Sequence, residues 1–191
     1  MAEQQANTWV KVPALPPQQA DGPLLEIYEA TSSNPHGREA ADGLHANESN
    51  ILTPKSIMTV GCWNVRTLYT TGATALLIHE LKKLRWDIIG IAETHWTGVE
   101  DKRYEDYRIL SCGREDMHRS GVALVLSPLA EKALLGHNPV NDRIITARFR
   151  TTIGRLTVCQ VYAPTTTASD NDMDEFYSTL QETISRIPKK D

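Results

Sequence analysis

The chain has 191 residues, of which 40% are hydrophobic and 23% are charged, and its formal net charge is −4. That length suits a single domain, and no apolar run approaches the roughly 18 residues that a membrane-spanning helix needs. No basic and then apolar segment at the N-terminus resembles a signal peptide. We therefore expect an intracellular protein, nuclear or cytoplasmic, without a membrane partner.

Residues 1–57 are predicted to be a disordered N-terminal tail. Prolines such as Pro13, Pro23 and Pro35 interrupt any helix there, and no apolar run keeps a sustained period. This tail holds three basic and seven acidic residues, whereas residues 58–187 hold 15 basic and 16 acidic ones. We expect the folded domain at 58–187, followed by a short C-terminal segment, 188–191. Because that domain is nearly neutral, any contact with DNA must be local.

Two apolar runs each end on one polar side chain. Residues 60–63 lead into Asn64, and residues 88–92 lead into Glu93. Leucines at helical spacing over residues 77–84 predict a helix between them. A strand, a helix and a strand form a crossover in which the two strands are parallel and end on the same edge of the sheet. We therefore expect Asn64 and Glu93 to lie close together.

These two residue types suit phosphate chemistry. A glutamate oxygen is a ligand that Mg²⁺ accepts, since this ion keeps most of its waters and takes one or two protein carboxylates. The Asn64 amide is able to hydrogen-bond a phosphate or a metal-bound water. The alternative interpretation is structural: Asn64 caps a turn and Glu93 simply ends a strand.

The remaining pattern indicates an α/β protein. Neighbouring strands are expected over 107–112 and 121–126, and a hairpin over 143–150 and 156–162. An apolar helix face is expected over 170–187, ended by proline. We interpret this set as roughly one sheet of a sandwich.

The three cysteines, Cys62, Cys112 and Cys159, all fall in expected strands. Their spacing matches neither a zinc site nor a disulfide framework. We expect them to be small core residues in a reducing compartment.

Four short motifs follow one another along the chain: Gly-Cys-Trp-Asn-Val-Arg-Thr-Leu at 61–68, Asp-Ile-Ile-Gly-Ile-Ala-Glu-Thr-His-Trp at 87–96, Arg-Ser-Gly-Val-Ala-Leu at 119–124, and Val-Tyr-Ala-Pro at 161–164. Together they resemble the endonuclease/exonuclease/phosphatase superfamily. Within it, the chain is most similar to the endonuclease domains of non-LTR retrotransposons and to craniofacial development protein 2-like proteins. The resemblance covers about residues 58–187.

The resemblance implies a fold, a reaction and a set of site residues. The fold is a deoxyribonuclease-like β-sandwich flanked by helices in four layers, and the reaction is hydrolysis of DNA phosphodiesters with Mg²⁺ or Mn²⁺. Glu93 corresponds to the metal ligand, Asn64 to the residue beside the metal and the scissile phosphate, and Tyr162 to the tyrosine that contacts that phosphate. Arg119 and Arg143 are further candidate phosphate contacts. No residue is predicted to bind an organic cofactor.

The sequence also departs from the family pattern. The resemblance implies a later strand ending Gly-Asp-Phe-Asn and a Ser-Asp-His segment, and neither occurs in these residues. We therefore expect weak binding of Mg²⁺, no effective catalysis, and an open sheet face that needs the missing C-terminal half or a partner to cover it. His95 is the nearest candidate substitute base, although a lone loop histidine is more often solvated or capping.

Two other functions stay open. One is a non-catalytic interaction or developmental protein that keeps the fold without the chemistry. The other is a phosphoinositide or sphingolipid phosphodiesterase of the same fold.

Overall fold

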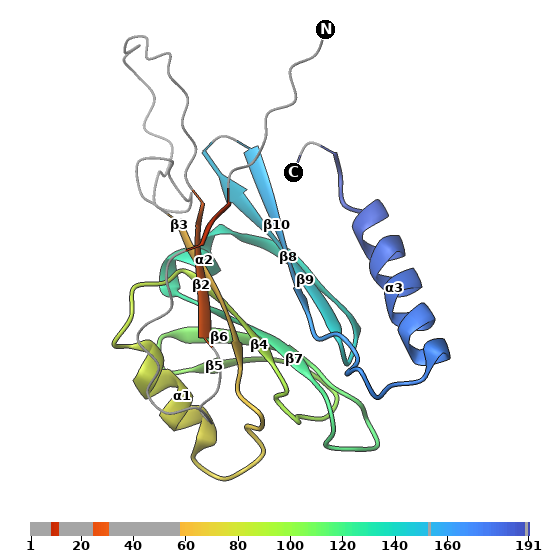
Figure 1. Cartoon of the computed structure of the whole chain (residues 1–191). Coiled ribbons are helices and arrows are strands. Elements are labelled where there is room, and N and C mark those ends of the chain that lie inside the picture. Colours follow the sequence, from red (N-terminus) through yellow and green to blue (C-terminus); the bar gives the residue numbers. More distant parts are fainter. Residues whose placement is uncertain (1–8, 12–24, 31–57, 153, 190) are drawn as a thin grey trace, which may run out of the picture.

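The computed structural model describes residues 9–11, 25–30, 58–152, 154–189 and 191, with side chains from residue 58 onward. Ten strands and three helices lie in these ranges (Figure 1). The first seven strands are β1 (Trp9–Lys11), β2 (Leu25–Ala30), β3 (Met58–Asn64), β4 (Ile88–Ala92), β5 (Val99–Tyr104), β6 (Tyr107–Cys112) and β7 (Val122–Leu126). The other three are β8 (Leu134–Asn141), β9 (Ile144–Thr151) and β10 (Gly154–Val161). The helices are α1 (Ala73–Leu81), α2 (Pro128–Ala133) and α3 (Asp170–Ser185).

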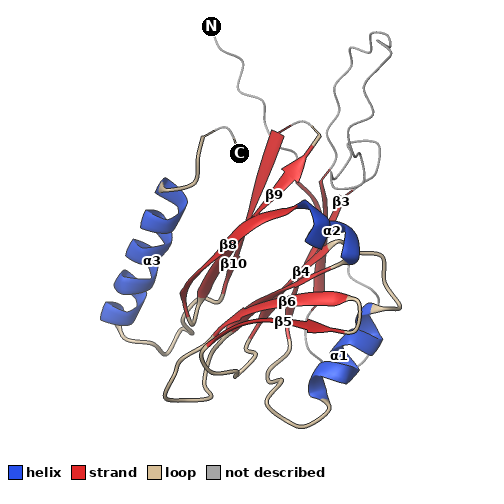
Figure 2. Ribbon diagram, turned by 180° about the vertical axis from the view of Figure 1, so that it is seen from behind, coloured by secondary structure: helices blue, strands red, loops and turns tan. Residues whose placement is uncertain are grey.

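The strands form two sheets. One has seven strands in the order β1-β2-β3-β4-β7-β6-β5, and the other has three in the order β10-β9-β8. The two sheets pack against each other, α1 covers the outer face of the larger sheet, and α3 lies beyond the smaller one (Figures 1 and 2). The protein is therefore α/β, with a mixed seven-stranded sheet packed on an antiparallel three-stranded sheet, and the sequence indicated the α/β class. The deoxyribonuclease-like fold in particular stays a prediction.

The crossover that positions the two polar strand ends is present. β3 and β4 are parallel, and the register pairs Asn64 with Ala92, so Glu93 follows directly. Leu77, Ile78 and Leu81 of α1 are buried against this sheet. The helix ends at Leu81, which leaves the predicted helical position 84 outside it.

The arrangement of the second sheet differs from the sequence-based expectation. We expected roughly one sheet with an exposed inner face, and this was wrong for the centre of the molecule. Leu110 and Leu124 on the larger sheet and Ile145 and Phe149 on the smaller one are all fully buried in one shared core. After α2 the chain turns back across the larger sheet, and the alternating apolar residues of β9 face inward there. The inner face is thereby covered over β4, β6 and β7.

Two segments of the expected N-terminal tail are strands. β2 pairs antiparallel with β3 from Leu25 opposite Trp63 to Ala30 opposite Met58, and β1 pairs with β2. This differs from an unfolded tail at those segments, because the edge of β3 offers backbone groups that a further strand satisfies. The rest of residues 1–57 lies outside the described residues, and the domain boundary at 58 stays a prediction.

Helix α3 begins as the sequence predicts but packs differently. Ser169 and Asp172 form a capping box at its start, in which each side chain accepts a hydrogen bond from the other residue's backbone N–H. Phe176 is buried, yet Tyr177 and Ile184 of the expected apolar face are 55% and 53% exposed. The helix therefore rests on the smaller sheet along a narrower stripe than its apolar positions suggest. None of the described helices is both long and apolar enough to cross a membrane.

Candidate phosphate site

Asn64 and Glu93 meet at the ends of β3 and β4. The Asn64 Nδ2 group donates a hydrogen bond of 2.6 Å to Glu93 Oε1, and the backbone N–H of Arg66 donates one of 3.0 Å to Asn64 Oδ1. The second bond orients the amide so that its nitrogen faces the carboxylate. The expected proximity of the two residues is confirmed, whereas their roles stay predictions.

The backbone around Glu93 adopts an uncommon conformation. Glu93 and His95 have positive φ angles of 60° and 57°. Residues other than glycine rarely occupy this left-handed region, and such strain persists where the surroundings hold it. Here the N–H of Thr94 donates to the Gly121 carbonyl at 3.1 Å, and the N–H of His95 donates to the Ser120 carbonyl at 2.7 Å. The loop that carries Glu93 is therefore fixed to the start of β7.

Tyr162 reaches Glu93 from the other sheet. Burial raises the pKa of Tyr162, the negative charge of Glu93 and a hydrogen bond between the two side chains raise it further, and Arg143 opposes them. A raised pKa keeps the Tyr162 hydroxyl protonated at neutral pH. The hydroxyl is thus available as a hydrogen-bond donor at the carboxylate.

Arg143 positions Tyr162. Its guanidinium lies over the tyrosine ring, 5.0 Å from the centroid, and its Nη1 donates to the Tyr162 carbonyl at 3.2 Å. In return, the Tyr162 N–H donates to the Arg143 carbonyl at 2.8 Å. Arg143 and Tyr162, two of the predicted site residues, are therefore in direct contact.

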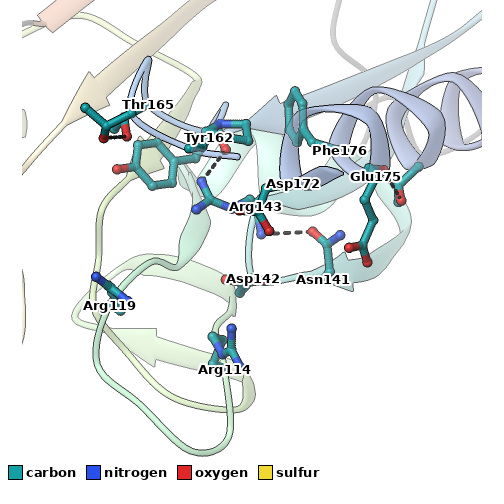
Figure 3. A pocket seen from close by; sticks show the side chains of 14 residues that line it. Arg114, Arg119, Asn141, Asp142, Arg143, Tyr162, Thr165, Asp172, Glu175 and Phe176 are labelled. Carbon is teal, nitrogen blue, oxygen red and sulfur yellow. Dashed lines mark hydrogen bonds between the residues drawn. The ribbon is translucent and has the colours of Figure 1, made fainter. Parts of the chain in front are cut away.

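A polar cleft of about 580 Å³ opens beside Tyr162 (Figure 3). Arg114, Arg119 and Arg143 line it, and Arg119 lies across it from Tyr162. Arg114 pairs with Asp116 at 3.2 Å, but in the described part of the chain neither Arg119 nor Arg143 forms an ion pair. Arg143 nevertheless attracts the Asp172 carboxylate electrostatically. Guanidinium groups outside a salt bridge favour an anionic ligand. The cleft also has an acidic wall, formed by Asp142, Asp172 and Glu175.

The residues at the site suit only a strongly hydrated metal ion. Across the residues that the structure describes, no three His, Cys, Asp or Glu side chains gather as a metal site. Glu93 is the carboxylate at the strand ends, and Asn64 already occupies one of its oxygens. Mg²⁺ tolerates this donor set, because it is often held by one protein carboxylate, waters and substrate phosphate oxygens.

Sequence reasoning missed a residue that joins the two sheets beneath the site. Gln160 is 6% exposed, accepts a hydrogen bond of 3.4 Å from Cys62 Sγ, and donates one of 3.0 Å to the Val161 carbonyl. A Cβ on Gly90 would lie 1.8 Å from Gln160 Oε1. Glycine at position 90 thus leaves room for the Gln160 amide. The hydrogen bond between Gln160 and Cys62 joins β10 to β3, and these residues stand two positions before Tyr162 and Asn64.

A second missed residue is Asp142, in the turn between β8 and β9. The Ser120 hydroxyl donates to its carboxylate, and its carbonyl accepts from the Gly121 N–H at 3.0 Å. The Asn141-Asp142 pair before an apolar strand is a turn signal that would have pointed to this position. Asp142 therefore links the cleft to the loop that holds Glu93.

Of the three cysteines that were expected to be core residues, Cys112 in β6 is buried, whereas Cys62 in β3 and Cys159 in β10 are only partly buried. Burial, and then the charges of Asp142 and Glu115, raise the pKa of Cys112 to about 11, and burial also raises the pKa of Cys159. Both thiols stay protonated at neutral pH, which is the opposite of what a nucleophile needs.

Comparison with known proteins gives one name. The chain is 36% identical to Craniofacial development protein 2 of Bos taurus over 172 residues, and 36% identical to the protein of that name from Tragulus javanicus over 155 residues. The matches cover 90% and 81% of this chain but only 29% and 27% of those proteins. No family model matches the chain.

These matches confirm part of the sequence-based resemblance. The similarity to proteins named Craniofacial development protein 2 is shown over most of the chain, and a match of 90% must include residues that precede Met58. The chain spans less than a third of the length of these relatives. The wider superfamily, the retroelement origin, the nuclease activity and the metal stay predictions.

Proposed function

We propose that Asn64, Glu93 and Tyr162 form the phosphate-facing part of a Mg²⁺-dependent DNA endonuclease centre. The observation that carries this proposal is that Glu93, after β4, interacts with two other candidate residues. Asn64 at the end of β3 donates a hydrogen bond to it, and Tyr162, which follows β10 of the other sheet, lies close enough for the carboxylate to raise the pKa of its hydroxyl. Open α/β sheets bind ligands at the carboxyl ends of their strands. The arginine cleft beside Tyr162 provides room for the neighbouring backbone of a nucleic acid.

Each residue has a distinct part in binding a phosphodiester. Glu93 would hold Mg²⁺, which when bound polarises a phosphoryl oxygen. The protonated Tyr162 hydroxyl would donate to a phosphate oxygen, and Asn64 would keep the Glu93 carboxylate in place. Arg119 and Arg143 would attract the phosphates on either side.

The described residues supply binding groups but no general base. His95 was the candidate substitute base, but its hydrogen bonds are made by its backbone. Its N–H donates to the Ser120 carbonyl, and its carbonyl accepts from His118 Nδ1. No second carboxylate is hydrogen-bonded to Asn64 or Glu93 in the described ranges. We therefore infer that the centre in this chain binds DNA and cleaves it poorly.

Plasmid nicking and DNA binding test this function together. The chain should bind a labelled oligonucleotide more tightly with Mg²⁺ than with a chelator, and nicking of supercoiled plasmid should stay at background. Glu93→Gln should remove the Mg²⁺-dependent part of the binding. If the affinity for the oligonucleotide changes neither on removal of Mg²⁺ nor with Glu93→Gln, the proposal is wrong.

Metal affinity gives a second, independent prediction. One carboxylate provides too little charge to hold a strongly hydrated ion firmly, so calorimetry should find Mg²⁺ binding no tighter than about the millimolar range. A micromolar dissociation constant would show that further ligands assemble around Glu93.

The names of the relatives favour a second candidate, a non-catalytic interaction protein. Nothing in the name Craniofacial development protein 2 refers to a nuclease. On this alternative the fold presents a surface to another protein, and Asn64 and Glu93 act only as a turn cap and a strand end. The DNA-binding experiment separates the two candidates, because only the first predicts an effect of Glu93→Gln.

A further inference from the structure

An exposed aromatic pair stands at the rim of the candidate phosphate site. The side chain of Tyr69 is 62% exposed, and its ring lies 4.1 Å from the ring of His118, centroid to centroid. Arg119, which lines the cleft, follows His118 directly. The pair therefore adjoins the arginine side of the cleft.

The loops that carry Tyr69 and His118 are hydrogen-bonded to the loop that carries Glu93. His118 Nδ1 lies 2.8 Å from the His95 carbonyl, and because a carbonyl only accepts, Nδ1 must carry the hydrogen. On the other side, the N–H of Leu68 donates to the Thr94 carbonyl at 2.9 Å, and Trp96 Nε1 donates to the Leu68 carbonyl at 3.2 Å. These bonds join the loop after β3 and the loop before β7 to the loop after β4.

We propose that Tyr69, backed by His118, stacks against a nucleobase of the bound strand and so selects nucleic acid over other phosphodiesters. This inference rests on the proposed function. One side of the Tyr69 ring packs on His118, and the high exposure leaves the rest of the ring open to a ligand. Aromatic rings beside cationic groups bind single strands by stacking, whichever base is present. The headgroup of a phosphoinositide or sphingolipid has no planar base to occupy this ring.

Two oligonucleotides test the stacking, one carrying a fluorescent purine analogue and the other abasic with the same number of phosphates. Tyr69→Ala should weaken binding of the base-containing strand at least about 5-fold and lose the quenching of the analogue, since one stacked base contributes that much or more. Tyr69→Phe should bind as the unaltered chain does, because the ring remains. Neither substitution should change binding of the abasic strand.

Tyr177 provides a matched control. It is also an exposed tyrosine, 55% accessible, but it lies on α3. Tyr177→Ala should leave binding of both strands unchanged, and thermal melting should show that all three variants fold.

The outcomes separate the two proposals. If the unaltered chain binds neither strand with Mg²⁺, the proposed function fails, and the stacking role fails with it. If the unaltered chain binds both strands and Tyr69→Ala binds them equally well, the stacking role is wrong while the phosphate site stands. An equal loss on both strands also contradicts stacking, since it would place Tyr69 on the backbone.

Discussion

Glu93→Gln is expected to slow plasmid nicking at least about 100-fold in a chain extended by the C-terminal residues that complete the centre. The extension would be a C-terminal segment of a related endonuclease, chosen because it carries the Gly-Asp-Phe-Asn and Ser-Asp-His motifs of the resembled family. Such a segment would bring further acids and a histidine to Asn64 and Tyr162. Removing the charge of a group that stabilises the transition state costs on the order of 100-fold or more in rate.

The comparison needs a glutamate away from the site. Glu100 is exposed on β5, where it pairs with Lys102. Glu100→Gln in the same extended chain should nick plasmid at the parent rate. If the extended chain is folded and cleaves DNA equally fast with Glu93→Gln, then Glu93 is only a strand end and the proposed centre is wrong.

Gly113→Ala is expected to destabilise the fold by about 2 to 3 kcal/mol, and thereby to disturb the loop that carries Glu93. A Cβ at position 113 would lie 1.8 Å from the carbonyl oxygen of Trp96 and 2.8 Å from its carbonyl carbon. Because these are backbone atoms, the clash cannot be relieved by turning a side chain, and overpacking of this kind costs about 1 to 3 kcal/mol or more. Urea unfolding followed by tryptophan fluorescence would measure the loss.

Gly136→Ala provides the matched change. Gly136 lies in β8, and a Cβ there would meet no atom within 4 Å. Its free energy of unfolding should stay within about 0.5 kcal/mol of the unaltered chain, as for most surface substitutions. If the two variants are equally stable, the backbone at Trp96 moves away from the added methyl group at little cost, and the close packing of Gly113 on the Trp96 carbonyl does not contribute to stability.

The local elements were predictable where the chain pattern is regular. The parallel pairing of β3 with β4, the neighbouring strands β6 and β7, and the hairpin of β9 with β10 were all expected from alternation, apolar runs and turn residues. β2 was missed, because it stands among proline-rich residues and owes its pairing to the open edge of β3. In α3 the helical period correctly predicted the helix, but Tyr177 and Ile184 of its apolar face are exposed. Whether such a face is covered depends on residues that are distant in the sequence.

The sequence by itself determined that Asn64 and Glu93 meet. Two strand ends joined by a crossover helix have little freedom, because such a connection makes the strands parallel and places both ends on one edge. The tertiary structure alone decided that Tyr162 lies near Glu93, that Arg119 and Arg143 share a cleft, and that the Tyr69 ring packs at a tilt against the ring of His118. Those contacts arise from the packing of one sheet over another and from hydrogen bonds between three loops. No periodicity along the chain encodes such contacts, since they depend on how apolar faces far apart in the sequence bury each other.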